Sequence, residues 1–217
     1  MHRIPILPPG PAPRRVLAIG AHCDDIEIGC GGTLLRLAAE NPDLEVTWFV
    51  LCSSERRRQE AEDSAASFLT GVRSRRVVVK GFRDGFLPYS GAAVKEEFEA
   101  LKPEVEPDLI LTHYRDDRHQ DHRTVSDLTW NTWRNHLVLE YEIPKWDGDL
   151  GAPNLFSPLP VATIERKIEI VLASFPSQAG KAWFQPDLFR SLARIRGMEC
   201  VAPEGHAEAF YARKACF

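Results

Sequence analysis

The chain has 217 residues, of which 44% are hydrophobic and 27% are charged. These fractions are typical of a soluble globular protein and exclude a collagen, a coiled coil and a largely disordered chain. The 27 Lys and Arg residues against 31 Asp and Glu residues give a net charge of −4. The chain therefore lacks the overall positive field with which a dedicated nucleic-acid-binding protein holds a polyanion.

The cysteines and the start of the chain predict its compartment. Five cysteines without a CxxC pair do not resemble a disulfide framework, and they favour a reducing environment. No apolar run approaches the roughly 18 residues of a membrane span, and the opening MHRIPILPPGPAPRR lacks the apolar core of a secretory signal. Its prolines predict an extended arm over residues 1–14, followed by one domain over residues 15–217. We expect a cytoplasmic protein without an integral membrane segment.

Strand and helix signals alternate after the arm. Strands are expected at Arg15–Ile19, Glu45–Cys52, Arg76–Lys80, Asp108–Thr112 and Leu137–Ile143. The segments between them are expected to be helical. In chain order they are the end of a loop and a helix within Gly31–Glu40, a helix capped by Ser53 or Ser54 and ending near Leu69, a helix at Ala92–Lys102 and a helix at Thr124–His136. This rhythm predicts right-handed βαβ units in a single α/β domain, with a mostly parallel sheet covered by helices on both faces.

The last third of the chain is less regular. Residues 146–160 are rich in Gly and Pro and predict a long loop. Helices are expected at Ile164–Ala173 and Asp187–Arg196, and Ala207–Ala212 is expected to form a closing edge strand.

Two polar segments follow the first and the fourth expected strands. Gly20–Gly32 reads GAHCDDIEIGCGG, and His113–His122 reads HYRDDRHQDH. In the common strand order 3-2-1-4-5, strands one and four flank the point where the order reverses, and ligands bind beyond their carboxyl ends. We therefore expect both segments to face one crevice.

The residue types in these segments suit metal-assisted hydrolysis. A tight turn could aim His22 and Asp25 at one point and direct Asp24 elsewhere, while the second segment offers His119 and His122. Two imidazoles and one carboxylate around an open position form a catalytic zinc arrangement. A further carboxylate can deprotonate water, and a nearby imidazole can protonate a leaving amine.

Other readings of these residues stay open. Asp24 or Asp25 could cap the next helix, and His113 suits a structural or supporting role. Cys23 could be a nucleophile, although the hypothesis of a metal site accounts better for the neighbouring residues. The three glycines at positions 29, 31 and 32 either expose backbone amides at a helix start or allow close packing of a helix on the sheet.

The motifs resemble those of the LmbE/PIG-L-like N-acetylglucosaminyl deacetylase family. Residues 21–25, AHCDD, resemble its AHPDD signature, and HYRDDRHQDH resembles its HxxDxHxDH signature. Residues 57–61, RRQEA, are similar to its RxxEA helix, and Arg196-Gly197 with residues 207–210, AEAF, are similar to its ending. The resemblance implies a Rossmann-like fold and zinc-dependent removal of an N-acetyl group, usually from an amino sugar in a conjugate.

By position, the resemblance implies that His22, Asp25 and His122 hold one zinc ion, although another divalent metal is possible. The chain departs from the family at Cys23, where the family normally has proline. The loss of that ring makes the turn less rigid and places a soft thiol beside the site.

The resemblance also implies the catalytic roles. Asp24 would be the general base, and His119 would stabilise the oxyanion or protonate the amine. Asp121 would orient one of the histidines, and Arg57 would contact the substrate.

Several functions remain in competition. The expected substrate is a small molecule or a glycoconjugate, and a homo-oligomer is possible. The same hydrolysis could act on a non-sugar amide or ester of a biosynthetic intermediate. A nucleotide-binding module is disfavoured because the first turn reads GAHCDD rather than GxGxxG. A non-catalytic metal-binding Rossmann-like protein stays open because of Cys23.

Overall fold

The computed structural model describes residues 14–215. The predicted N-terminal arm therefore lies outside the described residues, apart from Arg14, which begins the first strand. The strands are β1 (Arg14–Gly20), β2 (Leu44–Cys52), β3 (Ser74–Phe82), β4 (Leu109–His113), β5 (Leu137–Tyr141), β6 (Leu155–Pro158) and β7 (Ala207–Ala212). The α-helices are α1 (Asp25–Glu40), α2 (Glu55–Phe68), α3 (Gly91–Leu101), α4 (Gln120–Thr132), α5 (Val161–Ser174) and α6 (Pro186–Glu199).

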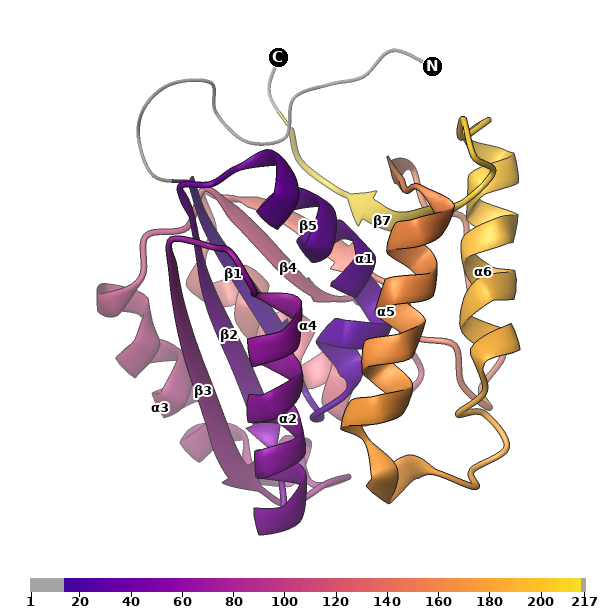
Figure 1. The fold of residues 1–217 in the computed structure, drawn as a ribbon. Coiled ribbons are helices and arrows are strands. Elements are labelled where there is room, and N and C mark those ends of the chain that lie inside the picture. Colours follow the sequence, from indigo (N-terminus) through magenta and orange to yellow (C-terminus); the bar gives the residue numbers. More distant parts are fainter. Residues whose placement is uncertain (1–13, 216–217) are drawn as a thin grey trace.

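The strands form one seven-stranded sheet in the order β3-β2-β1-β4-β5-β7-β6 (Figure 1). Strands β1 to β5 are parallel, and β7 runs antiparallel to both β5 and β6. The predicted single α/β domain with a mostly parallel sheet is confirmed, and so is the order 3-2-1-4-5. Two details are wrong. Residues 146–160 are not all loop, because four of them form β6, and β7 is not an edge strand because β6 pairs along its free side.

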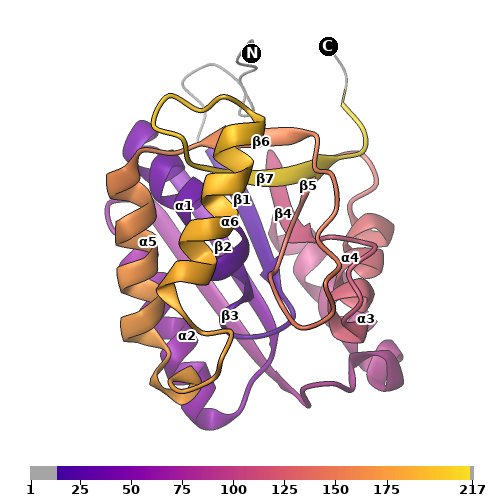
Figure 2. The same cartoon turned by 90° about the vertical axis from the view of Figure 1, so that its right-hand side faces the viewer.

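Helices cover both faces of the sheet. Helices α1, α2, α5 and α6 lie on one face, and α3 and α4 lie on the other (Figures 1 and 2). Successive side chains of a strand point to opposite faces, so Trp48 of β2 packs in the cluster under α1, α2 and α5, while its neighbour Phe49 packs with Phe98 and Trp133 under α3 and α4. None of the helices among residues 14–215 is both long and apolar enough to cross a lipid bilayer.

The sheet order brings the two polar loops together. Strand β1 pairs with β4, so the chain leaves both strands at the same edge of the sheet, where the strand order reverses. The helices that follow begin earlier than predicted. Helix α1 begins at Asp25, within the expected loop, and α4 begins at Gln120 instead of Thr124. The segment His113–His122 therefore ends in the first turn of α4, and the segment Gly20–Gly32 continues from its loop through the first two turns of α1.

The glycines of α1 allow close packing. A Cβ atom added to Gly29 would lie 2.1 Å from the ring of Tyr141, one added to Gly31 would lie 2.6 Å from Phe68, and one added to Gly32 would lie 2.6 Å from Leu159. All three positions are buried inside the helix. Of the two explanations left open by the sequence, packing of the helix against its neighbours is the one that fits.

Gly29→Ala should therefore destabilise the fold. The Tyr141 ring is buried, and its hydroxyl donates to the Ile19 carbonyl at 2.6 Å, so it cannot move away freely. Overpacking of this kind typically costs about 1–3 kcal/mol, and each kcal/mol lowers the Tm of a chain of this size by about 2–4 °C. Calorimetry of Gly29→Ala beside Gly91→Ala, where an added Cβ meets nothing within 4 Å, measures the effect. Equal Tm values for the two variants would contradict this packing argument.

The C-terminal third holds α1 in place through buried charges. The Glu208 carboxylate of β7 accepts hydrogen bonds from the backbone of Gly32 and Thr33 at 2.8 and 2.7 Å, and it pairs with Lys167 of α5 at 2.6 Å. Nearby, Arg196 of α6 forms two hydrogen bonds with the Glu142 carboxylate. The AEAF stretch thus fixes α1 where the first polar segment ends, whereas Arg196 of the RG pair holds Glu142, which follows β5.

Candidate active site

Donor atoms of three residues from different parts of the chain converge at the carboxyl edge of the sheet. His22 lies in the loop between β1 and α1, Asp25 is the first residue of α1, and His122 lies in the first turn of α4. His22 Nδ1 is 3.2 Å from His122 Nε2 and 3.3 Å from Asp25 Oδ2, and His122 Nε2 is 3.5 Å from Asp25 Oδ1. Tetrahedral zinc with bonds of about 2.0–2.1 Å separates its ligand atoms by about 3.3–3.4 Å. The spacing of these atoms therefore fits one bound cation.

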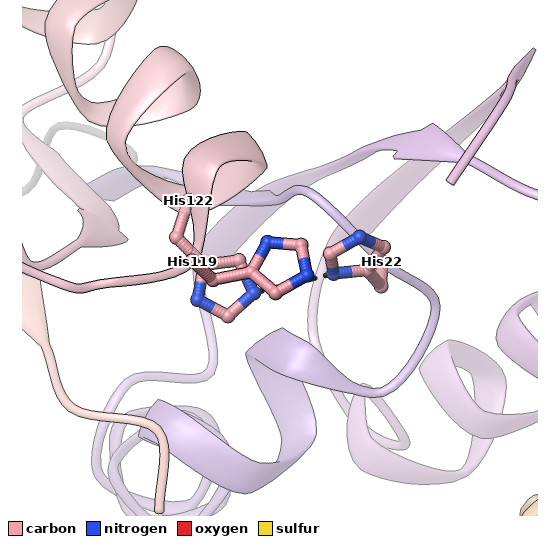
Figure 3. A group of neighbouring side chains, drawn as sticks. All are labelled: His22, His119 and His122. Carbon is pink, nitrogen blue, oxygen red and sulfur yellow. Dashed lines mark hydrogen bonds between the residues drawn. The ribbon is translucent and has the colours of Figure 1, made fainter. Parts of the chain in front are cut away.

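A third imidazole lies beside this group. Figure 3 shows His119 and His122 extending from the start of α4 toward His22. The His119 ring stacks on His122 with centroids 4.6 Å apart and meets His22 edge-on at 4.9 Å. One ring nitrogen from each of the three histidines lies within 4.8 Å of the other two, so they form a second possible ligand set.

Acidic side chains contact the second ring nitrogen of two of the imidazoles, on the side away from the convergent atoms. His122 Nδ1 is 2.9 Å from Asp117 Oδ2, and Lys145 pairs with the same oxygen at 2.8 Å. His22 Nε2 is 3.2 Å from Asp121 Oδ2. Such partners fix the ring orientation and the tautomer of a ligating histidine. Asp117 was not among the predicted site residues, although the HxxDxHxDH signature contains an Asp at this position.

His113 lies beneath the same group and is fully buried. Its Nε2 accepts a hydrogen bond from the Ala21 amide at 2.9 Å and lies 3.1 Å from Asp25 Oδ2. Its ring stacks on His122 with centroids 4.0 Å apart. This position suits the supporting role considered for it, because it backs both Asp25 and His122.

The protonation states of the three convergent residues differ. Burial lowers the pKa of His22, but Asp25, Asp121 and Asp84 raise it by more, so its pKa lies well above the usual value. Burial and the neighbouring His113 lower the pKa of His122 to about 4. Burial raises the pKa of Asp25, but the surrounding histidines lower it by more. Near pH 7, the His22 ring is therefore protonated on both nitrogens and positively charged, while His122 is neutral and Asp25 is ionised.

Asp24 is the N-cap residue of α1, but its side chain makes no capping hydrogen bond and contacts a different partner. Its Oδ1 forms an ion pair with Arg57 Nη2 of α2 at 2.9 Å, and both side chains are largely buried. Burial raises the pKa of Asp24 and Arg57 opposes that effect, with a net rise above the usual value. Arg57 was expected at the substrate, whereas its guanidinium contacts this carboxylate. The packing of α2 against α1 could not be read from the RRQEA motif.

His119 is the N-cap residue of α4. Its Nδ1 accepts a hydrogen bond from the Asp121 backbone amide at 3.2 Å. Because an accepting nitrogen carries no proton, the neutral ring has its proton on Nε2. Burial and the charge of His22 lower the pKa of His119, so the neutral form dominates near pH 7.

Cys23 does not have the environment of a nucleophile. The side chain is buried, and its thiol donates to the Cys52 carbonyl at 3.3 Å. Burial raises the pKa of this thiol to about 12, whereas a nucleophilic cysteine needs a lowered pKa. The thiol alternative is therefore disfavoured.

A protein-family comparison bears on the same region. The PIG-L family model, described as GlcNAc-PI de-N-acetylase, matches residues 17–133. This range contains both polar loops, Arg57 and all the site residues described above except Lys145.

Solved structures share the fold at low sequence identity. A conserved protein from Thermus thermophilus is 22% identical with a TM-score of 0.71, covering 93% of this chain and 96% of its own. The N,N'-diacetylchitobiose deacetylase from Pyrococcus horikoshii is 21% identical with a TM-score of 0.69, and the match covers 91% of this chain and 82% of the deacetylase chain. The 4-carboxy-2-hydroxymuconate hydratase from Pseudomonas putida is 15% identical with a TM-score of 0.73, covering 94% and 98%. The fold thus accompanies both a deacetylase and a hydratase, so it does not by itself decide the chemistry.

Proposed function

Because the chain belongs to the PIG-L family, we propose that it is a zinc-dependent amidohydrolase that removes an N-acetyl group from an amino-sugar conjugate. The observation that carries the proposal is the convergence of His22, Asp25 and His122 beside a second, independent carboxylate, Asp24. A ligand set next to a separate base is what hydrolysis of an amide requires.

We assign His22, Asp25 and His122 as the ligands of one divalent ion. Two imidazoles with one carboxylate suit zinc, and the donor spacing supports that choice. When bound, the ion supplies Lewis-acid polarisation of the acetamide carbonyl and makes a water molecule more acidic. Asp121 and Asp117 act through the ligands, by orienting His22 and His122 respectively.

Asp24 is assigned as the general base. Arg57 engages Oδ1, which fixes the carboxylate and leaves Oδ2 to accept the proton of the attacking water. The pKa rise that burial causes makes Asp24 a stronger base than an exposed aspartate. Arg57 is then a positioning residue as well as the substrate contact that the family motif suggests.

His119 is assigned to the developing oxyanion. Its Nε2–H can donate a hydrogen bond to the carbonyl oxygen as negative charge grows there, an interaction that often contributes strongly to catalysis. The leaving nitrogen then takes the proton that Asp24 removed from water. This route is preferred over proton donation by a charged His119, because the Asp121 amide occupies Nδ1 and burial lowers the pKa of the ring.

A substrate panel tests the proposal against its competitors. It contains N-acetylglucosamine conjugates, N-acetylated amines without a sugar, and acetate esters, and it measures acetate release. Release confined to the sugars supports the proposal, and release confined to the other compounds moves the activity to a non-sugar amide or ester. A metal-loaded protein that releases no acetate from any compound points to a non-catalytic metal-binding protein or to water addition, which consumes its substrate without releasing acetate.

Binding of the metal should release about one proton per ion at pH 7. The raised pKa of His22 means that the metal displaces its proton, whereas His122 and Asp25 are already deprotonated. Affinity should therefore rise about tenfold per pH unit until the pH passes the pKa of His22. Calorimetric titration of the metal-free protein in buffers with different ionisation enthalpies counts the protons. No proton release at pH 7, with affinity independent of pH, would contradict the assignment of His22.

A further inference from the structure

His22 presents its second ring nitrogen to another group of donor atoms. His22 Nε2 lies 3.2 Å from Asp121 Oδ2 and 3.1 Å from Asp84 Oδ1, and Cys52 Sγ lies 3.9 Å from the same Asp121 oxygen. None of these atoms belongs to the proposed catalytic ligand set. That set uses the other nitrogen of the His22 ring, Nδ1.

These atoms are spaced as ligands of one ion would be. The donor atoms of His22, Cys52 and Asp121 all lie within 4.8 Å of one another, and all three residues are buried or nearly so. Asp84 differs, because its side chain is 72% exposed. It therefore lies where an ion would enter, and its carboxylate oxygen is the fourth donor atom.

The backbone keeps this group in place. The Asp121 carboxylate accepts hydrogen bonds from the Gly85 and Leu87 amides at 2.7 and 3.1 Å. Cys52, the last residue of β2, donates its amide to the Ala21 carbonyl at 2.8 Å, next to His22. The donors thus come from four segments at this edge of the sheet, namely the loops after β1 and β3, the end of β2 and the start of α4, and no rearrangement of a helix or strand is needed to bring them together.

We propose that His22 Nε2, Cys52 Sγ and Asp121 Oδ2, with Asp84 as the fourth ligand, form a second cation site that inhibits the enzyme when zinc is in excess. A thiolate among the ligands selects zinc and cadmium over magnesium and calcium. The inference rests on the proposed function in one respect, namely that the first ion occupies the Nδ1 side of His22.

Occupation of the second site has a defined chemistry. The ion replaces the Nε2 proton of His22 and the thiol proton of Cys52, both of which pass to solvent, and no oxidation or reduction takes place. His22 is then shared between two positive ions, and Asp121 no longer serves only to orient it. Both changes weaken the hold of His22 on the first ion, so activity falls as the second ion binds.

Cadmium titration tests the site without reference to activity. Cadmium bound to a thiolate gives a charge-transfer absorption in the ultraviolet, and equilibrium dialysis counts the bound ions. The unaltered chain should bind two equivalents, the second with this absorption. Cys52→Ser should lose the second equivalent and the associated absorption, while Cys23→Ser, which alters another buried thiol at the same edge of the sheet, should keep both. Cys216, which lies outside the described residues, is present in all three chains and contributes equally.

Inhibition is tested by adding zinc beyond one equivalent. The unaltered chain and Cys23→Ser should lose activity as the second equivalent binds, whereas Cys52→Ser should keep its initial activity. Cadmium absorption that is the same in Cys52→Ser and Cys23→Ser would overturn the site, and equal zinc inhibition of the two would overturn its inhibitory role.

Two further measurements keep the test decisive. If Cys52→Ser does not fold, Cys52→Ala replaces it, and the X-ray absorption spectrum of the two-zinc protein must contain a sulfur neighbour or the site is rejected. Failure of the proposed deacetylation would be visible separately, as a protein that binds metal at both sites but releases no acetate.

Discussion

Asp24→Asn is expected to keep its metal and to lose turnover by about 10²–10⁴-fold, the usual loss when a positioned general base is removed. The amide has nearly the same shape as the carboxylate, but it cannot take a proton from water. Asp24 contacts Arg57 and no assigned ligand atom depends on it, so the metal content should stay close to one equivalent. Steady-state kinetics combined with elemental analysis of the same preparation measures both quantities.

Asp25→Asn is the matched control, because it alters the neighbouring carboxylate on the same helix. Asp25 lies against His22, His113 and His122, so this variant should lose metal and activity together. If Asp24→Asn lost metal while Asp25→Asn retained it, the roles of base and ligand would have to be exchanged.

His122→Ala is expected to lose most of its metal and with it all measurable deacetylation. Only His22 and Asp25 would remain of the assigned ligands, and two protein ligands do not make the three-ligand site that catalytic zinc uses. Competition with a chelator measures the metal affinity, and thermal unfolding checks that the fold is intact. Full metal occupancy in this variant would remove His122 from the ligand set and favour another of the neighbouring groups.

Asp117→Asn is expected to weaken metal binding less than His122→Ala does. It leaves the three ligands in place but alters the partner of His122 Nδ1 at 2.9 Å, a change that typically weakens metal affinity or activity by about 10–100-fold. The expected order of metal affinity is therefore the unaltered chain, then Asp117→Asn, then His122→Ala. Affinity unchanged in Asp117→Asn would mean that the His122–Asp117 contact does not support the metal.

The fold could be predicted from the sequence where the pattern is local and repeated. Alternating apolar strands and helices predicted the mostly parallel sheet, which is confirmed, and the common strand order assumed for such a sheet is the one observed for β1 to β5. The start of α1 was missed because three glycines resemble a loop, whereas they lie inside the helix because Tyr141, Phe68 and Leu159 leave no room for a side chain there. Strand β6 was missed because it has four residues and a terminal proline, and because it is defined by pairing with β7.

The site could be predicted only in part, because some of its contacts depend on how distant elements pack together. His22 and His122 come together because their loops leave neighbouring strands, which the topological rule anticipates. The contact of Arg57 with Asp24, and the approach of Cys52 to Asp121, depend on how α2 and the end of β2 pack against these loops. No spacing in the sequence encodes those contacts. The roles of the individual residues stay predictions until the variants above are measured.

The most direct test of the central claim is to measure acetate and new primary amine together, from an N-acetylglucosamine conjugate, with the metal-free and the zinc-restored chain. Hydrolysis of an acetamide yields one acetate for each amine, and the assigned mechanism needs the ion that His22, Asp25 and His122 hold. The account predicts equal release of both products with one equivalent of zinc and none without metal. Equal release by the metal-free chain, or no release from any N-acetylated sugar by the zinc-loaded chain, would contradict it.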